Sequence, residues 1–180
     1  NDFDKLSTFT IITAPTGTGK SMAFPFPVLS AQQKKGFSGL TKMSGLIVLP
    51  TNALIDELSE SFQKGYPTLN IKKLTGEELN KEGDSKGFKR YLKILDLAKE
   101  SDILITNPDI INYAMHGGYH HYLYSHRKTG RKEFVNFLEQ FQYIVFDEYH
   151  LYDESQIANI LTLVRLRDLL LQENNKIKYG

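Results

Sequence analysis

The sequence has no cysteine, which excludes disulfide bonds, zinc ribbons and thiol catalysis. It also lacks any apolar run long enough to span a bilayer, and residues 1–4 do not resemble a signal peptide, so we expect a cytoplasmic protein without a membrane partner. Neither sign of charge is in clear excess: with 22 basic and 21 acidic side chains, any basic surface for nucleic acid must be local. The 180 residues that are present suffice for one domain with its own hydrophobic core.

The segment 13–21, Thr-Ala-Pro-Thr-Gly-Thr-Gly-Lys-Ser, has the form of a phosphate-binding loop. It follows the apolar run 9–12 and precedes a stretch that can start a helix, so that backbone N–H groups of the turn can surround a phosphate. Lys20 then provides charge for the outer phosphates and Ser21 a hydroxyl for Mg²⁺. An ordinary glycine-rich turn is the alternative. The predicted nucleotide-binding residues are Ala14, Pro15, Thr16, Gly17, Thr18, Gly19, Lys20 and Ser21.

A second motif, Asp-Glu-Tyr-His at 147–150, ends the apolar run 143–146. A continuous apolar run is expected of a parallel strand covered on both faces, and acidic residues at its carboxyl end lie beside the P-loop in open α/β sheets. There Asp147 can hold Mg²⁺ through water, and Glu148 can orient and deprotonate the attacking water. Taken alone, this motif is more often a solvated loop, but downstream of a P-loop it predicts that Lys20, Asp147 and Glu148 are catalytic.

Strand-like runs alternate with helical patterns along the chain, which predicts an α/β fold: a mainly parallel sheet with helices on both faces. We expect strands at 9–13, 46–49, 70–74, 103–106 and 143–146, and helices at 20–33, 52–64, 88–99, 108–115, 131–140 and 154–172. Pro25 and Pro27 should end or kink the first helix after about two turns. The last helix is predicted to bury one face made of Ile157, Ile160, Leu161, Val164, Leu166 and Leu169, opposite Arg165, Arg167 and Asp168.

Two polar stretches interrupt this alternation. The stretch 76–86 predicts a mobile loop. The stretch 116–132 is a basic, aromatic insertion, and the spacing of its four histidines, His116, His120, His121 and His126, matches no zinc template. The insertion is a loop that contacts nucleic-acid backbone or bases, an exposed segment without such a role, or a metal site of another kind.

Short polar motifs follow the other predicted strands. They comprise Pro50, Thr51 and Asn52, then Thr75 and Gly76, then Thr106, Asn107, Pro108 and Asp109. Short hydroxyl side chains and helix N-termini present hydrogen-bond donors to phosphate oxygens, so these residues are predicted to hold one nucleic-acid strand by its backbone. The alternative is that they cap helices, and the two roles can coexist.

The pattern Ala-x-x-Gly-x-Gly-Lys-Ser at 14–21 and the pattern Asp-Glu-x-His at 147–150 resemble the P-loop and motif II of superfamily 2 DExH helicases, and the strand-end motifs follow in the same order. The resemblance covers the whole chain. It implies a first RecA-like motor lobe over residues 1–180, with ATP and Mg²⁺ as cofactors and His150 coupling hydrolysis to movement. No Ser-Ala-Thr motif III follows motif II, so we expect a lobe truncated before motif III that hydrolyses nucleotide barely, if at all, by itself.

Two segments narrow the resemblance further. Phe-Asp-Glu-Tyr-His-Leu-Tyr-Asp at 146–153 and Thr-Asn-Pro-Asp-Ile at 106–110 look like the standalone helicase of type I CRISPR interference systems. That family implies unwinding of target duplex along single-stranded DNA, with an interference complex and a separate HD nuclease as partners. The alternatives are another DExH helicase of RNA metabolism or DNA repair, and an isolated nucleotide-binding module without activity.

Overall fold

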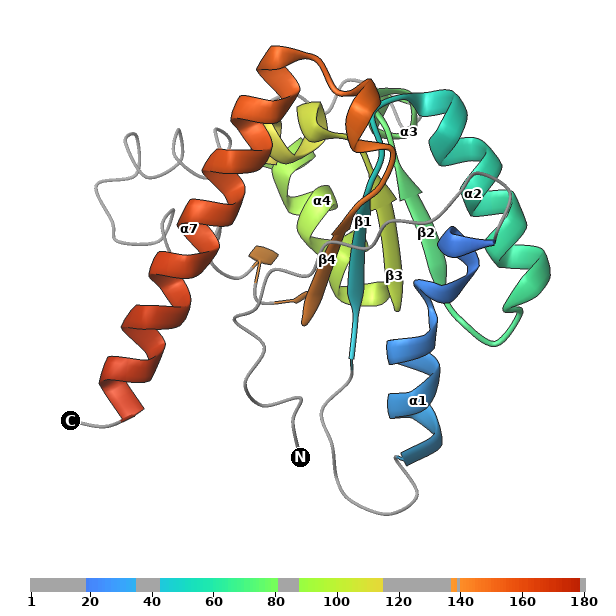
Figure 1. The fold of residues 1–180 in the computed structure, drawn as a ribbon, viewed down its shortest axis with the longest axis horizontal. Coiled ribbons are helices and arrows are strands. Elements are labelled where there is room, and N and C mark those ends of the chain that lie inside the picture. Colours follow the sequence, from blue (N-terminus) through green and yellow to red (C-terminus); the bar gives the residue numbers. More distant parts are fainter. Residues whose placement is uncertain (1–18, 35–42, 81–87, 115–136, 139, 179–180) are drawn as a thin grey trace.

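The computed structural model describes residues 19–34, 43–80, 88–114, 137–138 and 140–178, which are built around a parallel sheet (Figure 1). The four described strands are β1 (Gly45–Val48), β2 (Ile71–Leu74), β3 (Ile103–Thr106) and β4 (Tyr143–Phe146), in the order β2-β3-β1-β4. All neighbouring strands pair in parallel. The predicted α/β architecture is therefore confirmed, while the predicted strand at 9–13 lies outside the described residues.

Helices cover both faces of the sheet, as Figure 1 shows. They are α1 (Phe26–Lys34), α2 (Asn52–Gly65), α3 (Gly76–Asn80), α4 (Phe88–Glu100) and α7 (Glu154–Lys178), with a further helical segment at 108–114. Two 3₁₀ turns, η2 (Lys20–Ala23) and η3 (Tyr149–Leu151), follow Gly19 and Glu148. None of the described helices is both long enough and apolar enough to cross a membrane.

The apolar side chains of the central strands divide between two cores because successive residues of a strand point to opposite faces. Leu46 and Leu104 pack with α4 and α7 in one core. Ile47 and Ile105 pack with α1 and α2 in the other. Since β1 and β3 have apolar cover on both sides, their sequences are continuous apolar runs rather than alternating ones.

The strand β4 corrects one expectation. Its four residues are only partly buried, although the apolar run 143–146 predicted a strand covered on both faces. Within the described sheet β4 is an outer strand and pairs with β1 alone, so less of it is shielded from solvent.

The helix after the P-loop breaks sooner than its prolines predicted. Pro25 has no backbone N–H to give to the carbonyl of Ser21, which instead accepts a 3₁₀ bond from Phe24 N at 3.2 Å. The predicted helix at 20–33 is therefore two pieces, η2 and α1, and α1 begins only at Phe26.

Helix α3 was not predicted, because the stretch 76–86 suggested a mobile loop. The hydroxyl of Thr75 accepts from Glu78 N at 3.3 Å, and Leu79 anchors the helix in the core at 1% exposure. Thr-x-x-Glu is a capping-box sequence, so the signal for a helix start was present in the chain. Residues 81–86 lie outside the described part.

Helix α7 exists as predicted, but one residue of its predicted buried stripe, Leu161, was wrong. Ile160 and Leu163 are buried, whereas Leu161 is 61% exposed. Residues three apart share a helix face and adjacent residues do not, so burying Ile160 and Leu163 turns Leu161 outward. The predicted partners Leu166 and Leu169 have side chains outside the described set. Arg167 was assigned to the solvent side, yet it is half-buried and donates to Gln142 O at 2.8 Å.

The central position of β3 makes its core side chains the most sensitive to truncation. Leu104 is 0% exposed, so Leu104→Ala should lower the free energy of unfolding by about 2–5 kcal/mol, because the cavity left behind cannot fully collapse. The control Leu92→Ala, at a site 39% exposed, should cost less than about 1 kcal/mol. Urea denaturation measures both values, and equal losses would contradict the assignment of β3 to the core.

Candidate nucleotide-binding site

Lys20, Ser21 and Asp147 meet at the carboxyl edge of the sheet. The Nζ atom of Lys20 lies 2.8 Å from Asp147 Oδ1, and the Ser21 hydroxyl donates to Asp147 Oδ2 at 2.8 Å. The lysine and the serine belong to η2, whereas the aspartate directly follows β4. The structure therefore brings together three predicted site residues, two of them more than a hundred positions from the third; their roles toward nucleotide stay predictions.

Gly19 sets the backbone direction from which the lysine and serine project. Its φ is +74°, a left-handed conformation in which side chains are strained and glycine is not. The chain then turns at once into η2, and Met22 N donates to Gly19 O at 3.0 Å. The predicted phosphate-binding residues 14–18 lie outside the described part of the chain, so Gly19, Lys20 and Ser21 represent the loop here.

Asp147 is held ionised within a nearly closed environment. Its side chain is 5% exposed, and its backbone N–H continues the sheet by donating to Val48 O at 3.1 Å. Burial by itself would raise the pKa of Asp147, but hydrogen bonds from Lys20, Ser21 and the Glu148 N–H, with the charge of Lys20, outweigh burial and lower that pKa below its ordinary value.

Lys20 carries the matching positive charge. The hydrogen bond to Asp147 raises the pKa of Lys20, burial partly opposes this, and the charges of Asp147 and Glu148 add to the rise. The lysine side chain is 27% exposed, so it retains access to solvent while paired. It is therefore a cation that an incoming phosphate can draw away from the aspartate.

Glu148 has a strained backbone beside this cluster. Its φ is +52°, the only positive φ of a non-glycine residue in the described chain. Such a conformation costs about 1–3 kcal/mol and gathers at functional sites. The Glu148 N–H donates to Asp147 Oδ1 at 3.0 Å, and His150 Nδ1 lies 3.6 Å from Glu148 Oε2. The carboxylate of Glu148 is 31% exposed, which leaves it accessible to water.

The donor set suits Mg²⁺. A carboxylate and a hydroxyl are the hard oxygen ligands that this ion prefers, and it commonly takes one or two protein carboxylates together with substrate phosphates. Ser21 would hold the ion directly and Asp147 through water, as the sequence predicts. Among the described residues no cluster of three or more His, Cys, Asp or Glu could hold a metal. The phosphates of a nucleotide would complete the coordination.

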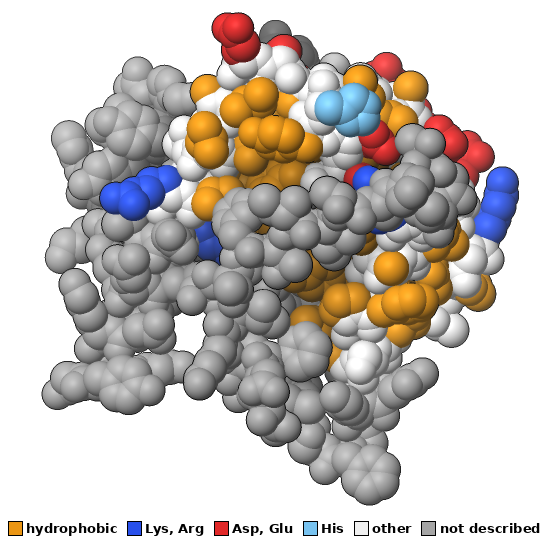
Figure 2. All heavy atoms as spheres, in the orientation of Figure 1, with side chains coloured by type: hydrophobic (Ala, Val, Ile, Leu, Met, Phe, Trp, Pro, Cys, Tyr) orange, Lys and Arg blue, Asp and Glu red, His pale blue; other side chains and the backbone are white. Residues whose placement is uncertain are grey.

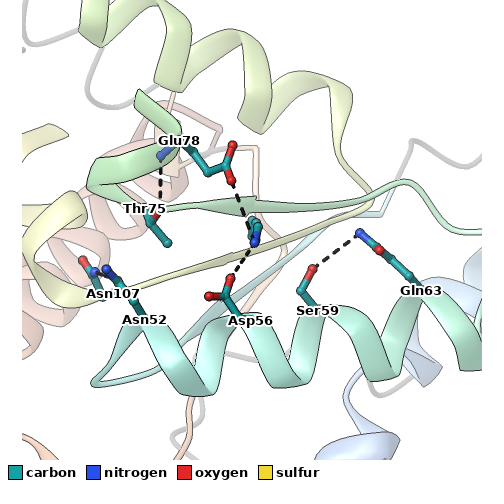
Figure 3. Close-up of polar contacts among 8 residues, drawn as sticks. Asn52, Asp56, Ser59, Gln63, Thr75, Glu78 and Asn107 are labelled. Atoms are coloured by element: carbon teal, nitrogen blue, oxygen red, sulfur yellow. Dashed lines mark hydrogen bonds and ion pairs between the residues drawn. The ribbon is translucent and has the colours of Figure 1, made fainter. Parts of the chain in front are cut away.

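Two of the predicted nucleic-acid residues cap helices. Thr51 accepts from Leu54 N at 3.4 Å at the start of α2, and Thr75 accepts from Glu78 N at the start of α3 (Figure 3). Thr51 is exposed, so it can cap and still contact phosphate, whereas Thr75 is 4% exposed. Capping thus accounts for both side chains.

Thr106 and Asn107 are tied into the interior. The Thr106 hydroxyl donates to Leu74 O at 2.8 Å and is 1% exposed. Asn107 donates to Asn52 Oδ1 at 3.0 Å, the contact between their side chains seen in Figure 3, and its own Oδ1 accepts from Ile110 N. The Thr106 hydroxyl is thus buried and already bonded, and its contact with a nucleic-acid strand stays a prediction.

Exposure divides the predicted strand-end set. Thr51, Asn52 and Asp109 are exposed, Gly76 is half-buried, and Pro50, Thr75, Thr106, Asn107 and Pro108 are buried. Beside them Lys73 lies between Asp56 and Glu78, 3.8 Å from the Glu78 carboxylate (Figure 3). A hydrogen bond from Lys73 to Asp56 raises the pKa of Lys73. This lysine is engaged by acids and is not a free cation for phosphate.

Sequence reasoning missed two side chains that join motif II to the end of β1. The buried Tyr152 hydroxyl donates to Val48 O at 2.7 Å, and Gln156 Nε2 donates to Pro50 O at 3.2 Å. Gln156 also exchanges bonds with Asp153, whose Oδ1 accepts from Gln156 N at 2.8 Å. Asp-x-x-Gln is a capping-box sequence, so the helix start could be predicted from the sequence. The hydrogen bond from Gln156 to Pro50 could not.

The surface next to motif II is apolar. Tyr149, Leu151 and Leu161 are each more than half exposed. Figure 2 shows hydrophobic side chains gathered on this face, over the first part of α7. The insertion 116–132, with its histidines, lies outside the described residues.

These features define a class: an α/β domain with a P-loop lysine and serine against a strand-end carboxylate. Residues 6–178 match the DEAD/DEAH box helicase family, and the chain belongs to that family. The predicted superfamily 2 helicase domain with a RecA-like fold is thereby confirmed.

One curated relative is the ATP-dependent RNA helicase DBP6 of Vanderwaltozyma polyspora. The chain is 31% identical to it over 98 residues, which cover 54% of this chain and 14% of the relative. The match therefore spans only a small part of that protein's length. No solved structure matches the chain significantly.

The lowered pKa of Asp147 makes the cluster's contribution to stability dependent on pH. At pH 7, Asp147→Asn should lower the free energy of unfolding by about 1–3 kcal/mol, because the amide leaves Lys20 without its anion. The folded pKa lies below the unfolded value of about 3.9, so this contribution is fully present above that value and is lost as pH falls through the folded pKa.

Urea denaturation of wild type and Asp147→Asn at several pH values measures this difference. It should be constant from about pH 7 to 5 and shrink below about pH 4. The exposed Asp96→Asn serves as control and should show little difference at any pH. A difference in the free energy of unfolding that persists or grows toward pH 2 would contradict an ionised, paired Asp147.

Proposed function

We propose that this chain is the ATP-binding lobe of an ATP-dependent nucleic-acid helicase. The observation that carries the proposal is the contact of Lys20 and Ser21 with Asp147 at the carboxyl edge of a parallel sheet. Membership of the DEAD/DEAH box helicase family supports ATP as the nucleotide and Mg²⁺ as its ion. The complete protein's activity, track and partners belong to the proposal too.

In the proposed reaction each residue has one task. Lys20 leaves Asp147 and neutralises the β- and γ-phosphates, while Gly19 and the rest of the loop donate backbone N–H groups. Ser21 directly and Asp147 through water would hold Mg²⁺, which would supply positive charge against the phosphates. Glu148 orients the attacking water and accepts its proton. His150, which lies beside Glu148, is proposed to couple this site to nucleic acid.

We propose single-stranded DNA as the track, on the resemblance of segments 106–110 and 146–153 to the type I CRISPR helicase. An interference complex and a separate HD nuclease are the corresponding partners. RNA is the second candidate, favoured by the similarity to the ATP-dependent RNA helicase DBP6. Among the predicted strand-end residues, three are exposed and available to contact either DNA or RNA: Thr51, Asn52 and Asp109.

Nucleotide binding should depend on Lys20. In Lys20→Ala the affinity for Mg²⁺–ATP should fall about tenfold or more, because hydrogen bonds to charged groups contribute about 1.5–3 kcal/mol. Lys72→Ala, in β2 at the opposite border of the described sheet, is the matched control and should bind like wild type. Isothermal titration calorimetry gives the affinities. Equal binding by wild type and Lys20→Ala would rule out the assigned phosphate site.

Hydrolysis should depend on Glu148 and on a nucleic-acid strand. The longer protein that contains this lobe should release phosphate faster with single-stranded DNA, and Glu148→Gln should reduce that rate about 10²–10⁴-fold because the general base is lost. The 180-residue chain alone should turn over barely, since an arginine finger from a second lobe is worth about 10³–10⁵ in rate.

A phosphate-release assay with DNA, with RNA and without either decides between the tracks. Stimulation by RNA alone would move the assignment to an RNA helicase. Strong strand-stimulated turnover by the 180-residue chain would show that its site needs no second lobe. Full activity of Glu148→Gln would remove Glu148 from the mechanism.

A further inference from the structure

The segment that links the P-loop to α1 is broken by prolines, yet two tyrosines from other elements hold it. We infer that Tyr66 and Tyr143 are positioning residues that fix η2, and through it Lys20 and Ser21, for phosphate binding. The inference rests on the proposed function of that site. It adds residues that no sequence motif of the chain marks.

The break leaves backbone carbonyls in need of donors. Pro25 and Pro27 have no N–H group, so regular helical bonding stops in this stretch and resumes with Leu29 N donating to Pro25 O at 3.1 Å. Two carbonyls in the break, those of Met22 and Phe24, accept from side chains instead. Both bonds are partly buried, and an unpaired carbonyl shielded from water is costly, so such donors stabilise one path of the chain.

Tyr143 is the first donor, and a glycine makes room for it. Its hydroxyl donates to Phe24 O at 2.9 Å, and burial raises its pKa, which keeps it a neutral donor. Gly45 is its register partner on β1. A Cβ atom at Gly45 would lie 2.2 Å from the Tyr143 ring, a separation no real contact allows. Gly45 therefore lets the tyrosine ring lie across β1.

Tyr66 is the second donor, at the end of α2. Its backbone N–H closes the helix by donating to Phe62 O at 2.8 Å, and its hydroxyl donates to Met22 O. Edge-on ring contacts to Phe62 and Phe26, with centroids 5.9 and 6.4 Å apart, fix the ring between α2 and α1. The adjacent Gly65 lies close to the same segment, since a Cβ there would be 3.0 Å from Met22 Cε.

Both anchors act within a few residues of the phosphate-binding groups. Met22 directly follows Ser21, and Phe24 N closes the turn on Ser21 O at 3.2 Å. A turn fixed at both carbonyls presents the serine hydroxyl and the lysine in one arrangement. Less conformational entropy is then lost when nucleotide binds, which strengthens binding without any direct contact to it.

The test uses the complete protein with Tyr66→Phe and Tyr143→Phe, which remove only the hydroxyls. Each should weaken Mg²⁺–ATP affinity about 3- to 10-fold, as expected for one hydrogen bond. Tyr113→Phe removes a hydroxyl on the other face of the sheet and is the matched control, with unchanged affinity expected. Affinities are measured by calorimetry well below the melting temperature of each variant.

A double-mutant cycle with Lys20→Ala separates positioning from general stability. If the tyrosines act through Lys20, their effect on affinity should largely disappear in the Lys20→Ala background. Gly45→Ala should reproduce the loss seen with Tyr143→Phe if it folds, and Tyr143→Phe decides the matter if it does not.

The failures can be told apart. Unchanged affinity of Lys20→Ala would overturn the proposed nucleotide site. A clear loss in Lys20→Ala, together with Tyr66→Phe and Tyr143→Phe that bind like Tyr113→Phe, would overturn this inference alone. Equal tyrosine effects with and without Lys20 would overturn the claim that the tyrosines position Lys20, because their effect would then be independent of that side chain.

Discussion

The ion pair between Lys20 and Asp147 is the central contact of the site, and it forms only because the sheet and the turn at Gly19 position both side chains. The aspartate reaches its position because β4 pairs in parallel with β1, so that both strands end at the same edge of the sheet. The lysine reaches it because Gly19 adopts a left-handed turn directly before η2. The carboxylate is buried and the lysine is partly exposed, so the pair is stable only while β4 and η2 keep their positions. An anionic phosphate can compete with Asp147 for the lysine.

Around this pair the chain uses side chains to brace irregular backbone. Tyr152 and Gln156 bond the end of β1 from the segment after motif II. Tyr66 and Tyr143 bond the break after η2. Irregular segments lack the internal bonding of helices and strands, so outside donors are what give them one conformation. The site is thereby fixed from three sides, by α2, by β4 and by the start of α7.

Sequence patterns located the regular elements well where burial was decisive. The run at 103–106 is strand β3 with the same bounds, because its residues are covered on both faces. Pattern reasoning was weaker where local bonds decide: the hydroxyl of Thr75 starts an unforeseen helix, and the missing N–H of Pro25 shortens the turn after the P-loop. Leu161 was wrongly placed in the core because apolar character alone does not fix the rotation of α7.

The residues of the candidate site could be predicted from the sequence, since Lys20, Ser21 and Asp147 belong to recognisable motifs. The residues that support the site could not be predicted, because Gly45 and Tyr143 are brought together only by strand register. The most direct test of the central claim is a crystal structure with Mg²⁺ and a non-hydrolysable ATP analogue. We expect Lys20 Nζ to have left Asp147 for the phosphate oxygens, with Ser21 Oγ on the ion. Nucleotide bound elsewhere, or Lys20 still paired with Asp147 beside bound phosphates, would contradict the account.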